Sequence, residues 1–284
     1  MASSPAYRGR FAPSPTGPLH MGSLVAAVAS YLDARAASGT WLLRIEDIDP
    51  PREAPGATDS ILRSLEYHGL HWDEAVLYQS TRLDAYATAL AALDDAKQIF
   101  RCCCTRATLG PGGNCRERCT PAVGDAIAYR VRLSGHVGFV DELMGAQAAP
   151  GVASDLVLKR KDGLYAYALA VVVDDAEQRI SHVVRGSDLI SQTFAQLELF
   201  ALLFGRQGAQ APRYAHLPLV YDPAGVKLSK QTGAMGIRDA AALNNLRCAL
   251  GFLGQASADM PAGSASELLS LATTHWSPGD ISCV

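Results

Sequence analysis

A Pro- and Gly-rich turn directly before an alanine-rich helical pattern constrains the fold of this chain more than any other segment. Residues 8–23 are RGRFAPSPTGPLHMGS, a short apolar run that ends in the turn. The first N–H groups of a helix are unpaired and lie at the positive end of the helix dipole, so anions bind there readily. His20 can donate a hydrogen bond to an anion at this place, and Gly22 allows a close backbone approach. The segment predicts an anion site, although most turns of this composition bind nothing.

A second segment, KLSKQ at residues 227–231, places the lysines Lys227 and Lys230 on a loop. Alone, such a segment is usually a solvated loop. Together with the Pro- and Gly-rich turn, it indicates a cleft that holds phosphate groups from two sides. One side is a helix N-terminus and the other is a pair of ammonium groups.

Hydrophobic periodicity predicts an α/β fold with a parallel sheet. Residues 7–12 and 41–45 are expected to be strands on either side of a helix over 20–37, and such a strand–helix–strand unit gives a parallel pair with a right-handed crossover. The remaining pattern predicts helices over 58–68, 82–97, 190–204, 239–253 and 264–272, and β-like segments over 166–174 and 180–185. Residues 101–125 have no periodicity and are rich in Cys, Gly, Pro and Arg.

Composition agrees with an ordinary globular protein of 284 residues, because 49% of the residues are hydrophobic and 19% are charged. Apolar runs such as residues 165–173 are too short to span a membrane, and residues 1–7 lack the features of a secretory signal. We therefore expect a cytoplasmic protein with no membrane partner.

The net charge of −3 argues against indiscriminate binding of nucleic acid but permits local basic patches. Each patch is either a contact surface for phosphates or a solvated face. The two candidate patches are Arg101, Arg106, Arg116 and Arg118, and Arg130, Arg132 and Lys159–Lys161.

Five of the seven cysteines lie between residues 101 and 125. In a cytoplasmic protein, clustered cysteines favour metal or redox chemistry over disulfides, and four thiolates suit tetrahedral Zn²⁺. A loop that is too poor in apolar residues to fold alone gains most from a metal. Reduced thiols without a ligand remain the alternative, because C-x-C followed by C-x₃-C is not the common zinc spacing. Cys248 and Cys283 are isolated.

The turn segment resembles the HIGH signature of class I aminoacyl-tRNA synthetases, in the form found in glutamyl and glutaminyl enzymes. KLSKQ resembles the KMSKS loop of the same family, with Leu228 in place of Met and Gln231 in place of the last Ser. The resemblance implies a Rossmann-like catalytic domain that activates an amino acid with ATP and Mg²⁺. It implies catalytic roles for His20, Lys227 and Lys230, and ATP binding by His20, Gly22 and Lys230.

A glutamate site is predicted from charge, because an amino acid with two carboxylates requires a guanidinium, a carboxylate and hydroxyls. Arg10 lies at the end of the first strand, Ser14 lies in the following turn, and Glu46 lies at the end of the second strand. This is the edge where α/β sheets bind ligands. The resemblance adds Tyr167 and Arg185. It implies that Glu46 holds the α-amino group and that the arginines hold the carboxylates. The full predicted set is Arg10, Phe11, Ala12, Pro13, Ser14, Glu46, Tyr167 and Arg185.

Three acidic residues give alternatives near this site. Arg185 can instead form a structural ion pair with Asp174 or Asp188. The pair Asp174-Asp175 is expected to be part of a turn, because nothing nearby supports a metal dyad.

The resemblance also implies one structural zinc ion per chain, because short glutamyl-type synthetases carry a zinc site of the pattern C-x-C, then Tyr, then Cys. Cys102 and Cys104 match the first pair, and Cys115 matches the last ligand. The Tyr position falls on Pro111, which cannot bind a metal, so Cys119 is the expected fourth ligand. Cys103 is the alternative.

The family pattern divides the chain into four parts. We expect the first half of the catalytic domain over 1–75, an acceptor-contacting insert over 76–165 with a zinc loop over 101–120, the second half of the catalytic domain over 166–235, and a short helical element over 236–284.

The acceptor is expected to be unusual. A discriminating glutamyl-tRNA synthetase needs an anticodon-reading domain of on the order of 100 residues, and residues 232–284 are too few for one. The chain resembles truncated paralogues that activate glutamate without tRNA and transfer it to queuosine at the wobble position of tRNA(Asp), and we expect a monomer. The alternatives are a truncated enzyme that charges the 3′ end of tRNA, and a non-catalytic RNA-binding module.

Overall fold

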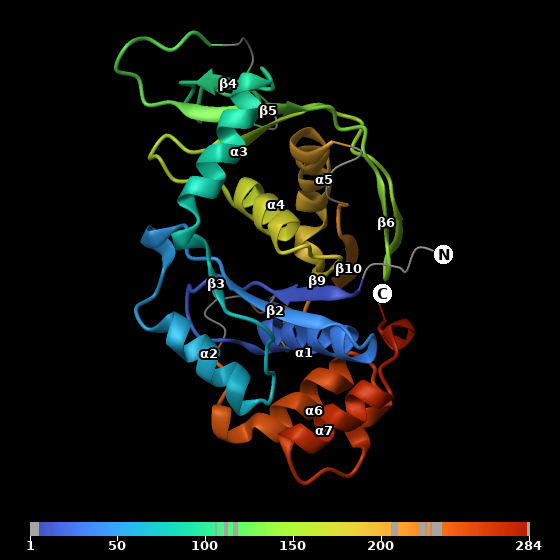
Figure 1. Cartoon of the computed structure of the whole chain (residues 1–284). Coiled ribbons are helices and arrows are strands. Elements are labelled where there is room, and N and C mark those ends of the chain that lie inside the picture. Colours follow the sequence, from blue (N-terminus) through green and yellow to red (C-terminus); the bar gives the residue numbers. More distant parts are fainter. Residues whose placement is uncertain are drawn as a thin grey trace.

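The computed structural model shows an elongated molecule in which the first two strands and their helix lie in the middle (Figure 1). It describes residues 6–105, 107–110, 113–115, 119–205, 210–221, 225, 228 and 235–282. A small antiparallel sheet lies at one end and the C-terminal helices lie at the other. In the described part of the chain, no helix is both long and apolar enough to cross a membrane.

The predicted strand–helix–strand unit is confirmed. β1 (Arg8–Phe11) pairs in parallel with β2 (Thr40–Ile45), with Arg8 opposite Thr40, and α1 (Met21–Ala36) connects them. The short β3 (Leu77–Tyr78) continues the parallel pairing beyond β2. Since all three strands run the same way, their carboxyl ends meet at one edge, where α/β folds bind ligands.

A second sheet continues the fold beside β1. Its order is β7 (Gly145–Gln147), β6 (Phe139–Asp141), β10 (Arg213–Leu217) and β9 (His182–Gly186), and β9, β10 and β6 are parallel. Ser181 N donates to Arg8 O at 2.9 Å, so the chain leading into β9 lies against β1. The two halves of the parallel fold therefore meet between β1 and β9.

Helix α1 forms the centre of the larger core. Leu24, Val28 and Leu32 are fully buried on the face that the 3.6-residue period predicts. They pack with residues of α2 (Ala57–Tyr67), α6 (Ala242–Phe252) and α7 (Ala265–Thr274). These helices confirm the predicted segments near 58–68, 239–253 and 264–272.

Residues of the predicted insert share a second core with two later helices. α3 (Leu83–Asp95) leads to the antiparallel order β4 (Ile99–Cys102), β5 (Ala128–Leu133), β8 (Ser154–Lys159). Apolar residues of this sheet pack against α4 (Tyr167–Glu177) and α5 (Ile190–Phe204). Among the residues that the structure describes, short 3₁₀ turns are formed by Pro50–Arg52, Gln79–Thr81, Ser187–Leu189, Asp239–Ala241, Ala256–Asp259 and Pro278–Asp280.

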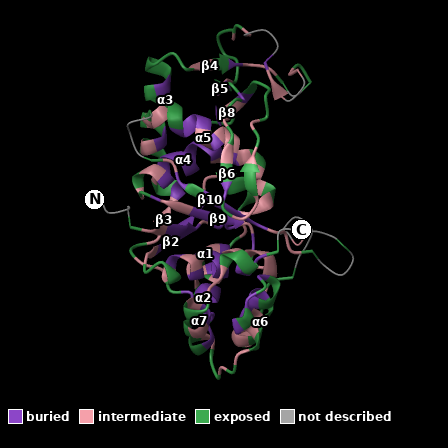
Figure 2. Cartoon of the chain, turned by 90° about the vertical axis from the view of Figure 1, so that its right-hand side faces the viewer, coloured by how far each residue is buried: buried purple, intermediate pink, exposed green. Residues whose placement is uncertain are grey.

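The β-like prediction for residues 166–174 is wrong, because these residues form the helix α4. Residues Ala168–Val173 are all buried, on every side of the helix (Figure 2). A helix that is apolar all round shows no 3.6-residue alternation, and its valines mimic a buried strand. The predicted turn at Asp174-Asp175 is wrong for the same reason, since both residues lie on α4 and are buried.

Candidate functional site

The start of α1, where the sequence predicts an anion site, borders a cavity. His20 is the N-cap of this helix, and its Nδ1 accepts a hydrogen bond from Ser23 N at 3.3 Å. His20, Gly22 and Ser23 line a cavity of about 180 Å³ together with residues from the end of β10, such as Pro218 and Leu219. A helix N-terminus and a neighbouring strand end thus face one space, as nucleotide-binding sites require.

Leu228 also lines this cavity, and its N–H donates to Val220 O at 2.8 Å. It is the described residue of the KLSKQ segment. Lys227 and Lys230 lie outside the described residues, so their roles remain predictions from the sequence.

A larger cavity of about 640 Å³ lies at the carboxyl end of β2. The structure brings together three predicted residues there, since Ser14, Glu46 and Tyr167 all line it. Glu46 N donates to Pro13 O at 3.0 Å, which ties the end of β2 to the turn after β1. Phe11 and Pro13 are buried and Ala12 is half-buried behind this wall.

Glu46 is a buried carboxylate with unmet hydrogen-bonding capacity. Among the described residues, its Oε1 has no hydrogen-bond partner, and the nearest guanidinium nitrogen, Arg44 Nε, is 3.9 Å away. Burial raises the pKa of Glu46 to about 7, although the positive charges of Arg44 and Arg10 oppose this shift. An ammonium group in the cavity beside Glu46 would favour the ionised carboxylate.

Two buried arginines behind the cavity are held by a residue that the sequence did not predict. Asp175 Oδ1 accepts from Arg44 Nη2 at 2.6 Å and from Arg10 Nε at 3.3 Å. Burial opposes ionisation of Asp175, but Arg10 and Arg44 outweigh it and lower its pKa. Asp175 therefore balances the charge of predicted Arg10. Its place two residues after the apolar run 167–173 was the only signal in the sequence.

Arg185 is buried beside the same cavity, and its hydrogen bonds go to neutral groups. Nη1 donates to Tyr167 Oη at 3.4 Å and Nη2 donates to Thr193 Oγ1 at 2.7 Å. The alternative ion pair with Asp174 is wrong, because Asp174 accepts from Gln79, Arg82 and Tyr86 instead.

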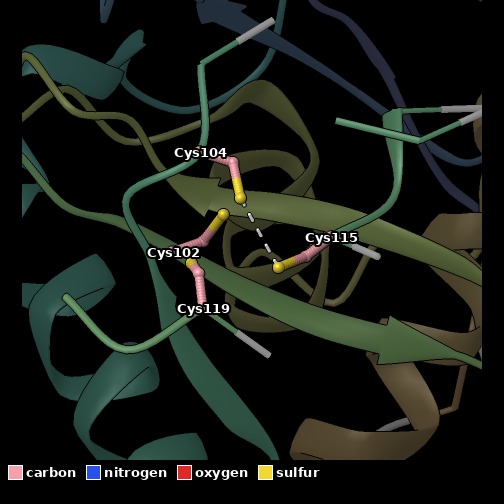
Figure 3. A group of neighbouring side chains, drawn as sticks. All are labelled: Cys102, Cys104, Cys115 and Cys119. Carbon is pink, nitrogen blue, oxygen red and sulfur yellow. Dashed lines mark hydrogen bonds between the residues drawn. The ribbon is translucent and has the colours of Figure 1, made fainter. Parts of the chain in front are cut away.

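The four predicted metal ligands lie together in the insert (Figure 3). Their sulfur atoms all lie within 4.8 Å of one another, and Cys104 Sγ is 3.6 Å from Cys115 Sγ. Four sulfurs about 2.3 Å from one zinc ion are about 3.8 Å apart, so this donor set fits a tetrahedral ion. The described group of four consists of Cys102, Cys104, Cys115 and Cys119.

The surroundings of the sulfur cluster favour a thiolate at Cys119, whereas burial raises the pKa of Cys102 and Cys104. Burial disfavours ionisation of Cys119, but hydrogen bonds from the Cys103 N–H and from neighbouring thiols outweigh it and lower its pKa to about 6. Cys115 N donates to Asp155 Oδ2 at 2.7 Å, which fixes one ligand to β8. The cluster can hold a metal ion.

Comparison with known proteins gives a consistent result. The profile of the family described as tRNA synthetases class I (E and Q), catalytic domain, matches residues 6–120 and 114–254. The glutamyl-Q tRNA(Asp) synthetase of Idiomarina loihiensis is 47% identical over 278 residues, which cover 95% of this chain and 96% of that protein. The protein of the same name from Escherichia coli K12 is 47% identical over 277 residues, covering 95% and 89% of the two chains.

Solved structures show the same fold. The glutamate tRNA ligase of Elizabethkingia meningosepticum, in complex with its amino acid, superposes with a TM-score of 0.78 at 25% identity. The superposition covers 98% of this chain and 66% of the ligase. A glutamate-tRNA synthetase from Elizabethkingia anophelis superposes with a TM-score of 0.77.

Proposed function

Because the chain belongs to the glutamate and glutamine (E and Q) family of class I tRNA synthetases, a family of ligases, we propose that it activates L-glutamate with ATP and transfers it to queuosine in tRNA(Asp). The activation step needs no tRNA. The names of the relatives that match nearly the whole chain support this acceptor.

The observation that carries the proposal is the distribution of charge around the larger cavity. Glu46 contributes a carboxylate to the lining of the cavity. Arg185 is a buried guanidinium, and its hydrogen bonds are made to neutral groups. An amino acid with an α-ammonium group and a second carboxylate satisfies both. Tyr167 lies between the two and can orient the ligand through its hydroxyl.

The chemistry follows from positioning and charge. A carboxylate of glutamate attacks the α-phosphate of ATP, which forms glutamyl-adenylate and releases pyrophosphate, and no protein nucleophile is required. His20, Gly22 and the N-terminus of α1 would hold the phosphates in the smaller cavity. Lys230, with Lys227, would neutralise the developing charge from the other side, and Mg²⁺ would accompany ATP.

The larger cavity has room for more than the amino acid. Its outer wall includes Arg52 and Arg160, and both guanidinium groups bond to Asp49 between them. Arg160 follows β8 of the insert, so this wall is shared by the catalytic sheet and the insert. A nucleoside entering through this wall would reach the activated acyl group.

The insert would be held by one structural zinc ion at Cys102, Cys104, Cys115 and Cys119. The neighbouring Lys161 Nζ donates to Cys103 O at 2.6 Å, so the cysteine loop is tied to the hairpin that carries Arg160. Zinc at this place would stabilise a surface for RNA beside the cavity.

Glutamate-dependent ATP–pyrophosphate exchange without tRNA tests the activation step. We expect exchange in the wild type and a loss of about 10²–10³-fold in kcat in Lys230→Ala and in His20→Ala, since each removes a donor to developing charge. Transfer is tested with radioactive glutamate and tRNA(Asp) that contains queuosine. Glutamate found on the 3′-terminal adenosine, with none on the queuosine, would contradict the proposed acceptor.

A further inference from the structure

The buried side chains behind Arg185 form a connected row that runs from β9 through β10 to β6. Arg185 Nε donates to His216 Nε2 at 3.2 Å, and His216 Nδ1 lies 2.5 Å from Asp141 Oδ2. His216 lies on β10, Asp141 ends β6, and both are fully buried. None of the roles above uses His216 or Asp141.

The hydrogen bonds of Asp141 fix its orientation. Its Oδ1 accepts from three backbone N–H groups, those of His216 at 3.1 Å, Leu143 at 3.0 Å and Met144 at 2.9 Å. Its Oδ2 is therefore the atom that faces the imidazole. Burial opposes ionisation of Asp141, but these hydrogen bonds and that of His216 outweigh it and lower its pKa. An ionised carboxylate only accepts, so His216 Nδ1 must carry a proton.

The opposite nitrogen of His216 then has a lone pair. Burial lowers the pKa of His216 and Arg185 acts in the same direction. Together they outweigh the opposing effect of Asp141, so the ring is neutral near pH 7. A neutral imidazole protonated on Nδ1 accepts at Nε2, where the Nε–H of Arg185 arrives. The carboxylate thus selects the one tautomer that can bind the guanidinium.

Side chains of α5 accept the hydrogen bonds of Nη2 of Arg185. Nη2 donates to Thr193 Oγ1 at 2.7 Å and to Gln196 Oε1 at 2.8 Å. Among the described residues, Nη1 donates only to Tyr167 Oη, at the long distance of 3.4 Å. Tyr167 lines the cavity, so Nη1 is the end of the guanidinium nearest to the substrate.

We propose that Asp141 and His216 are positioning residues that hold Arg185 with its Nη1 toward a carboxylate of the amino acid. Asp141 sets the tautomer of His216, and His216 fixes the rotation of the guanidinium plane through Nε. The substrate carboxylate is thereby met by a pre-oriented donor, with no protein carboxylate competing for it. Because this role rests on the proposed function, its test must distinguish the two.

The substitution Asp141→Asn reverses one hydrogen bond with almost no change of shape. The amide oxygen must stay with the three backbone N–H donors, so the NH₂ group takes the place of Oδ2 and donates to His216 Nδ1. The ring then carries its proton on Nε2, where it opposes the Nε–H of Arg185. Thr193 Oγ1 lies 3.1 Å from Nε2 and can accept that proton, so the ring stays in place and Arg185 turns away.

The experiment combines kinetics with nitrogen NMR of histidine-labelled protein. We expect protonated Nδ1 on His216 in the wild type and protonated Nε2 in Asp141→Asn, with His216→Gln identifying the signal. In Asp141→Asn the KM for glutamate should rise about 10- to 100-fold, while the KM for ATP changes less than about twofold. The matched control is Asp33→Asn, a carboxylate that accepts from Trp276 and Tyr7 and should leave both values unchanged.

Three results would overturn the role. One is protonated Nε2 on His216 in the wild type, a measurement that does not depend on whether any variant folds. Another is a normal KM for glutamate in Asp141→Asn although its tautomer is reversed. The last is a wild type with protonated Nδ1 that supports no glutamate-dependent exchange, in which case the proposed function fails while the described geometry is correct.

Discussion

The Glu46 carboxyl lies near its own titration midpoint at neutral pH, because burial raises its pKa to about 7. Only the ionised form can hold an α-ammonium group. In the free enzyme, affinity for glutamate should therefore increase as pH rises toward and through about 7, and fall about tenfold per unit below it. The KM for glutamate in exchange assays from pH 5.5 to 8 measures this. Glu46→Gln should raise the KM about 10- to 100-fold and remove the pH dependence.

The thermal stability of Glu46→Gln shows whether Glu46 is only a structural residue. Because its pKa in the folded protein is raised above the ordinary value of 4.5, the native state binds the extra proton. The resulting stabilisation is complete below about pH 4.5 and is lost as pH rises to about 7. Glu46→Gln should thus melt no lower than the wild type at pH 8. A lower melting temperature with an unchanged KM would show that Glu46 is a structural residue.

A substitution at Gly22 tests whether the smaller cavity binds ATP. A Cβ at this position would lie 3.2 Å from Cε1 and Nδ1 of the His20 ring, so Gly22→Ala must displace His20. We expect the KM for ATP to rise about 10-fold and the KM for glutamate to stay constant, as exchange assays at varied substrate would show. Gly279→Ala is the matched control, because nothing lies within 4 Å of a Cβ there. An equal KM for ATP in both variants would show that ATP binds outside this cavity.

Residues of the site could be predicted from the sequence where they belong to a short sequence motif. Glu46, Ser14 and Tyr167 follow recognisable segments, and they do meet in one cavity. Asp141 and His216 were not predictable, because a hydrogen bond between residues 75 positions apart depends on the pairing of β6 with β10. No local pattern in a sequence records which buried carboxylate will select the tautomer of a distant imidazole.

At the scale of elements, the parallel unit β1–α1–β2 could be predicted and α4 could not. Half-buried elements show their period in the sequence, whereas α4 is enclosed between the insert and α5 and is apolar on all sides. This placement has a consequence for the site. The last turns of α4 bring Asp175 to the buried Arg10 and Arg44, and Asp174 to the half-buried Arg82. A strand could not do this with two consecutive residues, because their side chains would point to opposite faces.

The insert loop is the element that a metal should stabilise most. Purified protein is expected to contain about one zinc ion per chain, and Cys104→Ser should lose it, since one of four thiolate ligands is removed. Metal analysis and thermal melting measure both effects. Cys248→Ser is the control, because Cys248 is exposed on α6 and outside the cluster.

Transfer to RNA should suffer more than exchange in Cys104→Ser. The sulfur cluster is in the insert, while His20 and Glu46 lie on the catalytic sheet and its helix. Metal-free protein with full stability and full transfer activity would contradict a structural metal.

The whole molecule is a stack in which the catalytic sheet separates the insert from the C-terminal helices (Figure 1). Trp276 attaches the C-terminal segment to α1, because its Nε1 donates to Asp33 at 2.9 Å. Tyr7 Oη donates to the same carboxylate at 2.6 Å. The larger cavity opens instead between the sheet and the insert, through Arg52 and Arg160. Contacts to RNA are therefore expected around this opening.

The final prediction follows from this placement. If the RNA is recognised by the walls of the cavity and the insert beside it, a short anticodon stem-loop of tRNA(Asp) that carries queuosine should be glutamylated at a rate within about tenfold of the whole tRNA. The same stem-loop with guanosine at the wobble position should give no product, because the nucleophilic hydroxyl of the queuosine ring is absent. Rising salt should weaken binding, and less so in Arg160→Ala, which loses one candidate phosphate contact. Glutamylation of whole tRNA(Asp) with none on the stem-loop would mean that the enzyme reads a distant part of the RNA.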